Sequence, residues 1–175
     1  GTLLASRILG KVAIKEGYDV KVSEVHGMSQ RGGSVVTYVK YGDKVYSPII
    51  DRGEADLILA FEMLEAMRAL PYLKKGGKMI ANTQKMNPMP VITGAMEYPE
   101  NIEEKLSAKI NLQAVDALSL AEKAGTIKAV NVVLIGLLAK SMDVDKNVWI
   151  DVIKETVPEK FLDVNIKAFE LGYEL

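Results

Sequence analysis

The sequence has no cysteine and a single histidine among its 175 residues. Without cysteine the chain can form no disulfide, no thiolate zinc site and no cysteine-ligated iron–sulfur cluster, and it cannot use a thiol as a nucleophile. One histidine is too few for a metal site built from several imidazoles. We therefore expect no metal site in this chain. The lack of cysteine agrees with a reducing compartment, and we predict a cytoplasmic location.

An excess of charge of one sign is also missing, because 22 Lys and Arg residues face 23 Asp and Glu residues and the net charge is −1. Such a balance attracts neither a phosphate backbone nor an anionic membrane. The longest apolar stretch, residues 129–139, is interrupted by Asn131 and Gly136 and falls short of the roughly 20 residues of a membrane helix. No secretory signal pattern opens the chain. We expect neither nucleic acid nor a membrane as a partner.

Helix-like and strand-like patterns alternate along the first part of the chain. Apolar residues recur every four positions across residues 3–15, which predicts an amphipathic helix, and residues 18–23 alternate apolar and polar side chains, which predicts a strand. Residues 34–40 and 45–50 are rich in strand-forming residues on either side of a Gly-Asp turn, which predicts a hairpin. The unbroken apolar run 56–61 predicts a strand covered on both faces.

The same alternation continues toward the C-terminus. The sequence predicts a turn at Gly76-Gly77, strands at 78–82 and 110–115, and helices at 63–70, 100–108, 116–123, 127–142, 146–155 and 160–171. Three prolines exclude a regular helix or a central strand throughout residues 86–99, so we expect a long functional or linking loop there with one short strand. Together the patterns predict an α/β fold, with one three-layer α/β/α domain over residues 1–175, a largely parallel central sheet, a β-hairpin and C-terminal helices.

The densest polar cluster follows the second predicted element, and loops at the carboxyl end of a strand are where α/β sheets gather ligand-binding groups. Arg31 offers a planar fork for a carboxylate or a phosphate, and the glycines let a ligand approach the backbone closely. The alternative is a glycine-rich turn whose Arg31 and Glu24 pair with each other, and composition alone favours it. The candidate residues of this loop are Glu24, His26, Gly27, Met28, Ser29, Gln30, Arg31, Gly32 and Gly33.

Two smaller sites are also candidates. Gly1 and Thr2 stand at the start of a predicted helix, where free N–H groups can receive an anion, and the alternative is an ordinary helix cap. Asn82 and Thr83 close a predicted strand and are candidates for the edge of a pocket. The alternative for this pair is a turn that hydrogen-bonds its own backbone.

The segment Ser-Glu-Val-His-Gly-Met-Ser-Gln-Arg-Gly-Gly-Ser-Val at residues 23–35 resembles the gamma-type domain of the 2-oxoacid:ferredoxin oxidoreductases, in the form found in the indolepyruvate branch of that superfamily. Supporting segments are residues 1–5, 47–50, 55–62 and 131–136. The match spans nearly the whole chain. Because the family begins with a strand and a Gly-x-Gly-Gly-Gln-Gly loop, the resemblance implies that Gly1 is the last glycine of that loop and that the strand and the rest of the loop are missing from this sequence.

The resemblance implies a division of labour between two kinds of chain. Thiamine diphosphate and the 4Fe-4S clusters are expected on a partner alpha subunit, which decarboxylates an aryl 2-oxoacid such as indolepyruvate and passes electrons to ferredoxin, while coenzyme A takes the acyl group. This chain is then the non-redox subunit, without a catalytic residue or a cofactor of its own. Its candidate loop is expected to close the entrance for substrate or coenzyme A or to contact the partner, chiefly through His26 and Arg31. A homodimer is possible when the chain is isolated.

Two other classes of function compete with the enzyme subunit. The chain can instead be a nucleotide-binding α/β regulatory module, or a purely architectural dimerisation domain whose loops are remote from any substrate. Binding of a nicotinamide or adenine nucleotide to the isolated chain would favour the regulatory module. Activity that requires a thiamine-binding partner would favour the enzyme subunit.

Overall fold

The computed structural model describes residues 1–27 and 34–175. These residues form two compact units, one made of residues 1–50 and 120–175 and the other of residues 51–119. The expectation of one domain over residues 1–175 stays a prediction. Within the described part of the chain, no helix is both long and apolar enough to cross a membrane.

The first unit opens with helix α1 (Thr2–Lys15), which buries Ile8 and Val12 on the predicted apolar stripe. Gly17 follows the helix with a φ of +89°, a left-handed conformation that glycine adopts without steric cost. The chain then enters strand β1 (Asp19–His26). The switch from a helical to a strand period in the sequence therefore marks the helix end correctly.

The hairpin of the first unit is formed by a different pair of strands from the pair that the sequence predicts. Strand β2 (Val35–Gly42) pairs antiparallel with β1 over eight residue pairs, and in the described ranges residues 45–50 form no strand. The Val45 N–H instead donates to the Asp19 side chain at 2.9 Å, and the Lys40 ammonium donates to the carbonyl oxygen of Ile49 at 3.1 Å. These bonds use backbone groups of residues 45–50 that pairing with a strand would need. The predicted pairing of residues 34–40 with residues 45–50 is therefore wrong.

The C-terminal helices complete the first unit, as the sequence predicts. Their bounds are η2 (Ile127–Ala129), α6 (Val130–Lys140), α7 (Lys146–Thr156), η3 (Glu159–Phe161) and α8 (Leu162–Tyr173). Asp145 caps α7, because its carboxylate accepts the Asn147 N–H at 2.7 Å. Helix α6 is buried from residue 131 to residue 139, which explains why its sequence is apolar on every side.

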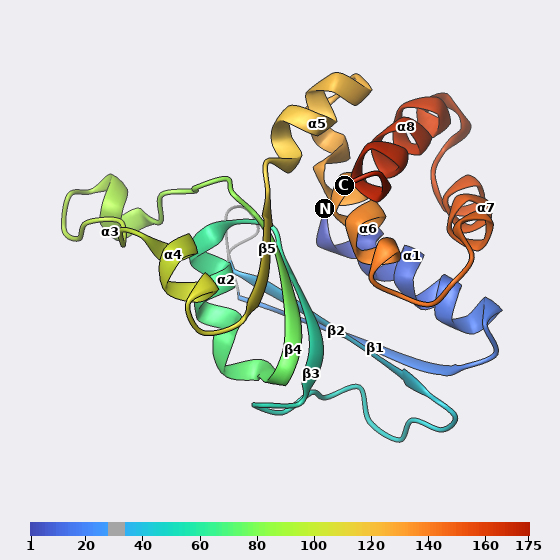
Figure 1. Cartoon of the computed structure of the whole chain (residues 1–175), viewed down its shortest axis with the longest axis horizontal. Helices are drawn as coiled ribbons and strands as arrows, with labels where there is room; N and C mark the ends of the chain where they lie inside the picture. Colours follow the sequence, from blue (N-terminus) through green and yellow to red (C-terminus); the bar gives the residue numbers. More distant parts are fainter. Residues whose placement is uncertain (28–33) are drawn as a thin grey trace. The chain divides into compact units, whose positions relative to one another are not determined.

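The second unit contains a parallel sheet with the strand order β3-β4-β5 (Figure 1). The strands are β3 (Ala55–Ala60), β4 (Leu73–Asn82) and β5 (Asn111–Val115). Two helices pack with the sheet, namely α2 (Met63–Ala69) and α4 (Ile102–Ser107). The buried core between them includes Met63, Ala66, Met79, Ala81 and Leu106. The fold class is therefore confirmed as mixed α/β, with a parallel sheet, a hairpin and C-terminal helices.

Two details of this unit differ from the sequence-based expectation. Gly76 and Gly77 lie within β4, which starts earlier than predicted, right after the short helix η1 (Leu70–Tyr72). A Cβ on Gly77 would lie 2.9 Å from the carbonyl oxygen of Asp56, so this glycine allows the two strands to approach where their register shifts. The middle of β3 is only half-buried rather than covered on both faces.

The proline-containing segment 86–99 holds the short helix α3 (Met89–Ile92) in place of the expected short strand. Pro90 fits this helix because it lies in the first turn, where a backbone N–H has no intrahelical acceptor. Helix α5 (Ala117–Ala124) follows β5 and begins in the second unit. Its first residues contribute to the site described next.

Candidate functional site

The three parallel strands end at the same edge of the sheet, because their carboxyl ends point in one direction. The polar residues at this edge are Glu62 just after β3, Asn82 at the end of β4 and Asp116 just after β5. Such an edge is the usual position of a ligand site in an α/β sheet.

Asn82 is fully buried and joins the ends of all three strands. Its side-chain N–H group donates to the carbonyl oxygen of Phe61 at 3.1 Å and to the Gln84 side chain at 3.3 Å. Its side-chain oxygen accepts the backbone N–H of Ala117 at 3.1 Å. These bonds occupy the polar atoms of Asn82 inside the protein, and the two to backbone atoms reach residues 21 and 35 positions away rather than the backbone of its own turn. Its role at a pocket edge stays a prediction.

Thr83, the second residue of that predicted pair, continues the connection between strands. Its backbone N–H donates to the carbonyl oxygen of Val115 at 2.9 Å, and one residue later the carbonyl oxygen of Gln84 accepts the N–H of Met63 at 3.1 Å. Thr83 itself is half-buried. The backbone after β4 is thus fixed on both sides, by the end of β5 and by the start of α2.

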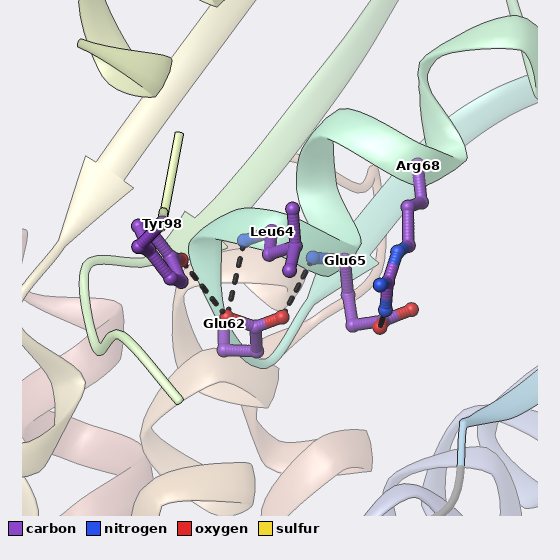
Figure 2. A network of polar contacts seen from close by, with 5 residues as sticks. All are labelled: Glu62, Leu64, Glu65, Arg68 and Tyr98. Carbon is purple, nitrogen blue, oxygen red and sulfur yellow. Dashed lines mark hydrogen bonds and ion pairs between the residues drawn. The ribbon is translucent and has the colours of Figure 1, made fainter. Parts of the chain in front are cut away.

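Glu62 is the buried carboxylate of this edge and begins helix α2 (Figure 2). One carboxylate oxygen accepts the N–H of Leu64 at 3.0 Å and the hydroxyl of Tyr98 at 3.3 Å, and the other accepts the N–H of Glu65 at 2.8 Å. A carboxylate at a helix start satisfies backbone N–H groups that lack intrahelical acceptors and interacts favourably with the helix dipole. The buried charge is therefore stabilised by three hydrogen bonds.

Tyr98 reaches Glu62 from the far end of the segment that contains α3. Burial is the main cause that raises the pKa of the Tyr98 phenol, and the neighbouring Glu62 carboxylate raises it further. The phenol thus keeps its proton and donates a hydrogen bond to the Glu62 carboxylate. The Lys85 ammonium lies 5.8 Å from the centroid of the Tyr98 ring, within the range of a cation–π interaction. Arg68 pairs with Glu65 on the outer side of α2 (Figure 2).

Sequence reasoning missed the pair formed by Glu62 and Tyr98. Glutamate is not among the preferred N-cap residues, and Tyr98 lies 36 residues further along the chain. A glutamate directly between a predicted strand and a predicted helix was the one available signal. The hydrogen bonds of Glu62 to Tyr98 and to the start of α2 fix the backbone at the sheet edge.

The principal predicted site, the loop of residues 24–33, is described only in part. Glu24 and His26 lie in strand β1, which runs further than predicted, and not in a loop. These two residues and Gly27 are exposed, and the Nδ1 atom of His26 lies 3.3 Å from the carbonyl oxygen of Gly27. The rest of the loop lies outside the described residues, and those positions are Met28, Ser29, Gln30, Arg31, Gly32 and Gly33. The roles assigned to this loop, including the alternative pairing of Arg31 with Glu24, stay predictions.

Gly1 and Thr2 stand at the beginning of α1, as expected, with Gly1 in the N-cap position. The carbonyl oxygen of Gly1 accepts the N–H of Ala5 and the side-chain N–H of Asn131, each at 3.2 Å. Binding of an anion at this helix start stays a prediction. In the described portions of the chain, no group of three His, Cys, Asp or Glu side chains has a geometry that could hold a metal ion.

Comparison with known proteins gives a match over the full chain. The family model described as pyruvate ferredoxin/flavodoxin oxidoreductase matches residues 1–175. The indolepyruvate oxidoreductase subunit IorB of Pyrococcus horikoshii is 45% identical, with 98% of this chain and 88% of that protein covered. The subunit of the same name from Thermococcus kodakarensis is 44% identical, with the same coverage.

Among solved structures, the gamma subunit of a keto/oxoacid ferredoxin oxidoreductase from Geobacter sulfurreducens has the same fold. It superimposes with a TM-score of 0.70 at 23% sequence identity, and the alignment covers 98% of this chain and 88% of that one. This likeness concerns the fold alone, because the sequence identity is low.

Proposed function

The chain belongs to the pyruvate ferredoxin/flavodoxin oxidoreductase family, and on this premise we propose that it is the non-redox subunit of an indolepyruvate:ferredoxin oxidoreductase. The observation that carries the proposal is the identity of 44–45% to two chains named as indolepyruvate oxidoreductase subunits, over 98% of the length of this chain. The chain is a subunit of a 2-oxoacid:ferredoxin oxidoreductase.

The proposed reaction is the oxidative decarboxylation of an aryl 2-oxoacid. The acid loses carbon dioxide and two electrons, the electrons reduce two ferredoxin molecules, and coenzyme A takes the acyl group with release of a proton. Thiamine diphosphate and the iron–sulfur clusters belong, in this proposal, to a partner alpha subunit. The chemistry of the available side chains supports that division, because a chain without cysteine has no thiolate for such a cluster.

The contribution of this chain is to bind and to position rather than to react. We assign to the loop of residues 24–33 a place at the junction with the partner, where His26 and Arg31 contact an anionic group of coenzyme A, substrate or the partner chain. An arginine buried at such a junction needs a carboxylate or phosphate partner, since an unpaired buried charge costs several kcal/mol. The acidic and amide groups at the sheet edge keep the second unit in one conformation.

Activity of the separated and assembled chains tests this proposal. The full chain expressed alone should not reduce a viologen dye in the presence of indolepyruvate and coenzyme A, whereas the chain co-expressed with a thiamine-binding partner should. A panel of pyruvate, phenylpyruvate and indolepyruvate then identifies the preferred acid. Robust activity of the chain alone would contradict the subunit assignment, and a preference for pyruvate would contradict the aryl substrate.

A further inference from the structure

Three of the eight methionines of the chain fall in one short segment, namely Met86, Met89 and Met96. The segment contains helix α3 and lies between β4 and the start of α4. Figure 1 shows α3 on a loop that extends away from the strands of its unit, beyond α4. Because the chain has no cysteine, all of its sulfur is in methionine, and any sulfur chemistry of this protein is chemistry of thioethers.

Exposure to solvent separates these three side chains from the methionines of the core. Met86, Met89 and Met96 leave 56%, 66% and 64% of their surface open to solvent. Met63 and Met79 leave only 3% and 0% open and belong to the buried core of the second unit. An oxidant dissolved in water therefore reaches the first three thioethers directly, whereas it reaches the two core thioethers only when the unit opens.

The fold of the segment does not depend on burial of these side chains. Within the described structure, α3 buries no residue of its own. The backbone is closed by bonds from the N–H of Ile92 to the carbonyl oxygen of Pro88 at 3.0 Å and from the N–H of Met96 to that of Pro90 at 3.0 Å, and neither bond involves a side chain. A sulfoxide is polar and disrupts a packed core, but at an exposed position water solvates it. Oxidation at these positions should therefore leave the fold intact.

We propose that Met86, Met89 and Met96 form a reversible oxidation site, at which a peroxide converts the exposed thioethers to sulfoxides without unfolding the chain. A sulfur lone pair attacks one oxygen of hydrogen peroxide, the O–O bond breaks, an S–O bond forms, and the other oxygen leaves as water after proton transfer. Sulfur loses two electrons and the peroxide gains them. A methionine sulfoxide reductase reverses the change with a dithiol, which becomes a disulfide while the oxygen leaves as water. This chemistry switches the surface of the segment between apolar and polar, and it is independent of the proposed function.

Treatment of the full chain with hydrogen peroxide tests the site, with the oxygen on each methionine followed by peptide mass spectrometry. Sulfoxide should form at Met86, Met89 and Met96 at least about tenfold faster than at Met63 and Met79, because the exposed fractions differ by more than that. Once the three sites are oxidised, the midpoint of thermal unfolding should stay within about 2 °C of its original value. A methionine sulfoxide reductase should then remove the oxygen. Equal rates at exposed and buried methionines, a larger fall of the midpoint, or oxygen that the reductase leaves in place would each overturn the proposal.

A variant that carries Met86→Leu, Met89→Leu and Met96→Leu gives a second measurement, because leucine keeps the apolar volume but has no sulfur. Its initial uptake of oxygen should fall to about half of the wild-type rate or less, whereas the matched control Met142→Leu, at a half-buried position, should keep at least about three quarters of that rate. An uptake rate that the triple variant leaves unchanged would contradict the proposal.

The complex with a thiamine-binding partner shows whether the site stays accessible in the assembled enzyme. Met86, Met89 and Met96 should still take up oxygen there, and complete protection of all three would overturn the proposal while the proposed function stands. If no complex forms, the proposed function fails, and the rates measured on the full chain still decide whether the oxidation site exists.

Discussion

Gly136 of α6 and Gly172 of α8 lie directly against each other in the first unit. A Cβ built on Gly136 would lie 3.1 Å from the carbonyl carbon of Gly172 and 2.1 Å from the carbonyl oxygen of Phe169. A Cβ built on Gly172 would lie 2.0 Å from the carbonyl oxygen of Val133. The two helices thus pack backbone against backbone, and neither position has room for a side chain.

Gly136→Ala should therefore destabilise the protein strongly. The added methyl group has to push α8 away from α6, and overpacking of this kind costs about 3 kcal/mol of unfolding free energy. For a chain of this length the midpoint of thermal unfolding should fall by roughly 6–12 °C. Gly42→Ala is the matched control, because the described residues leave open space around Gly42, and it should change stability by less than about 0.5 kcal/mol. Equal midpoints for the two variants would show that α6 and α8 are not this close.

Glu62→Gln tests the buried cap of α2. The amide keeps one acceptor oxygen but replaces the other with an N–H₂ group, which cannot accept the hydrogen bonds that the carboxylate receives. We expect a loss of about 1–2 kcal/mol in urea unfolding. Glu65→Gln, which removes the charge that pairs with Arg68 at the surface, should cost less than about 0.5 kcal/mol. An equal cost for both would mean that the carboxylate oxygens of Glu62 do not cap the helix.

Tyr98→Phe should change how stability depends on alkaline pH. Burial and the Glu62 carboxylate raise the pKa of Tyr98 in the folded protein, so the folded state holds this proton more tightly than the unfolded state does. The stabilisation is present below the usual tyrosine pKa of about 10 and is lost as the pH rises through the higher folded value. The Phe variant should be less stable than wild type by about 1 kcal/mol at pH 7, and the difference should shrink above pH 10. A constant difference across that range would exclude the coupling.

Asp19→Asn should change how stability depends on acidic pH. The Val45 N–H, and then the Lys21 ammonium, donate to the Asp19 carboxylate and lower its pKa. A lowered folded pKa stabilises the protein above the usual aspartate value of about 4, and this contribution is lost as the pH falls through the folded value. Between pH 5 and pH 3, wild type should therefore lose more stability than the variant. Urea unfolding at both pH values measures this, and parallel losses would contradict the prediction.

Arg31→Ala tests the proposed role of the loop in the assembled enzyme. Loss of a charge-assisted bond to an anionic group should lower kcat/KM for coenzyme A by about tenfold or more. Arg52→Ala, at an exposed position in the second unit, is the control and should leave that value unchanged. Weaker assembly with unaltered turnover and unaltered KM for coenzyme A would instead favour a purely architectural loop.

The sequence predicts the fold class and most of the elements, because their signals are local. The apolar stripe of residues 3–15 becomes α1, the apolar run at 56–61 becomes β3, and Asp145 caps α7. The resemblance to the family is confirmed by the full-length match. These signals are available from the sequence because each depends on side chains that are close together along the chain.

Relationships between distant residues could not be predicted in the same way. A strand-forming run does not specify its partner, so the bond between Asp19 and Val45, which lie 26 residues apart, gave no signal before the fold was known. The same holds for Tyr98 and Glu62. The position of Asn82 at a strand end was predictable, but its burial depends on β3 and α5, which reach it only in the folded chain.

The position of Asn82 has a consequence for how the second unit opens. Because one amide side chain connects the residue after β3, the end of β4 and the first turn of α5, the separation of any of these segments breaks a bond of the Asn82 side chain. The backbone amides of Met63, Thr83 and Ala117 should therefore exchange with deuterium at one shared rate, as a single cooperative opening, rather than fray one after another from the strand tips.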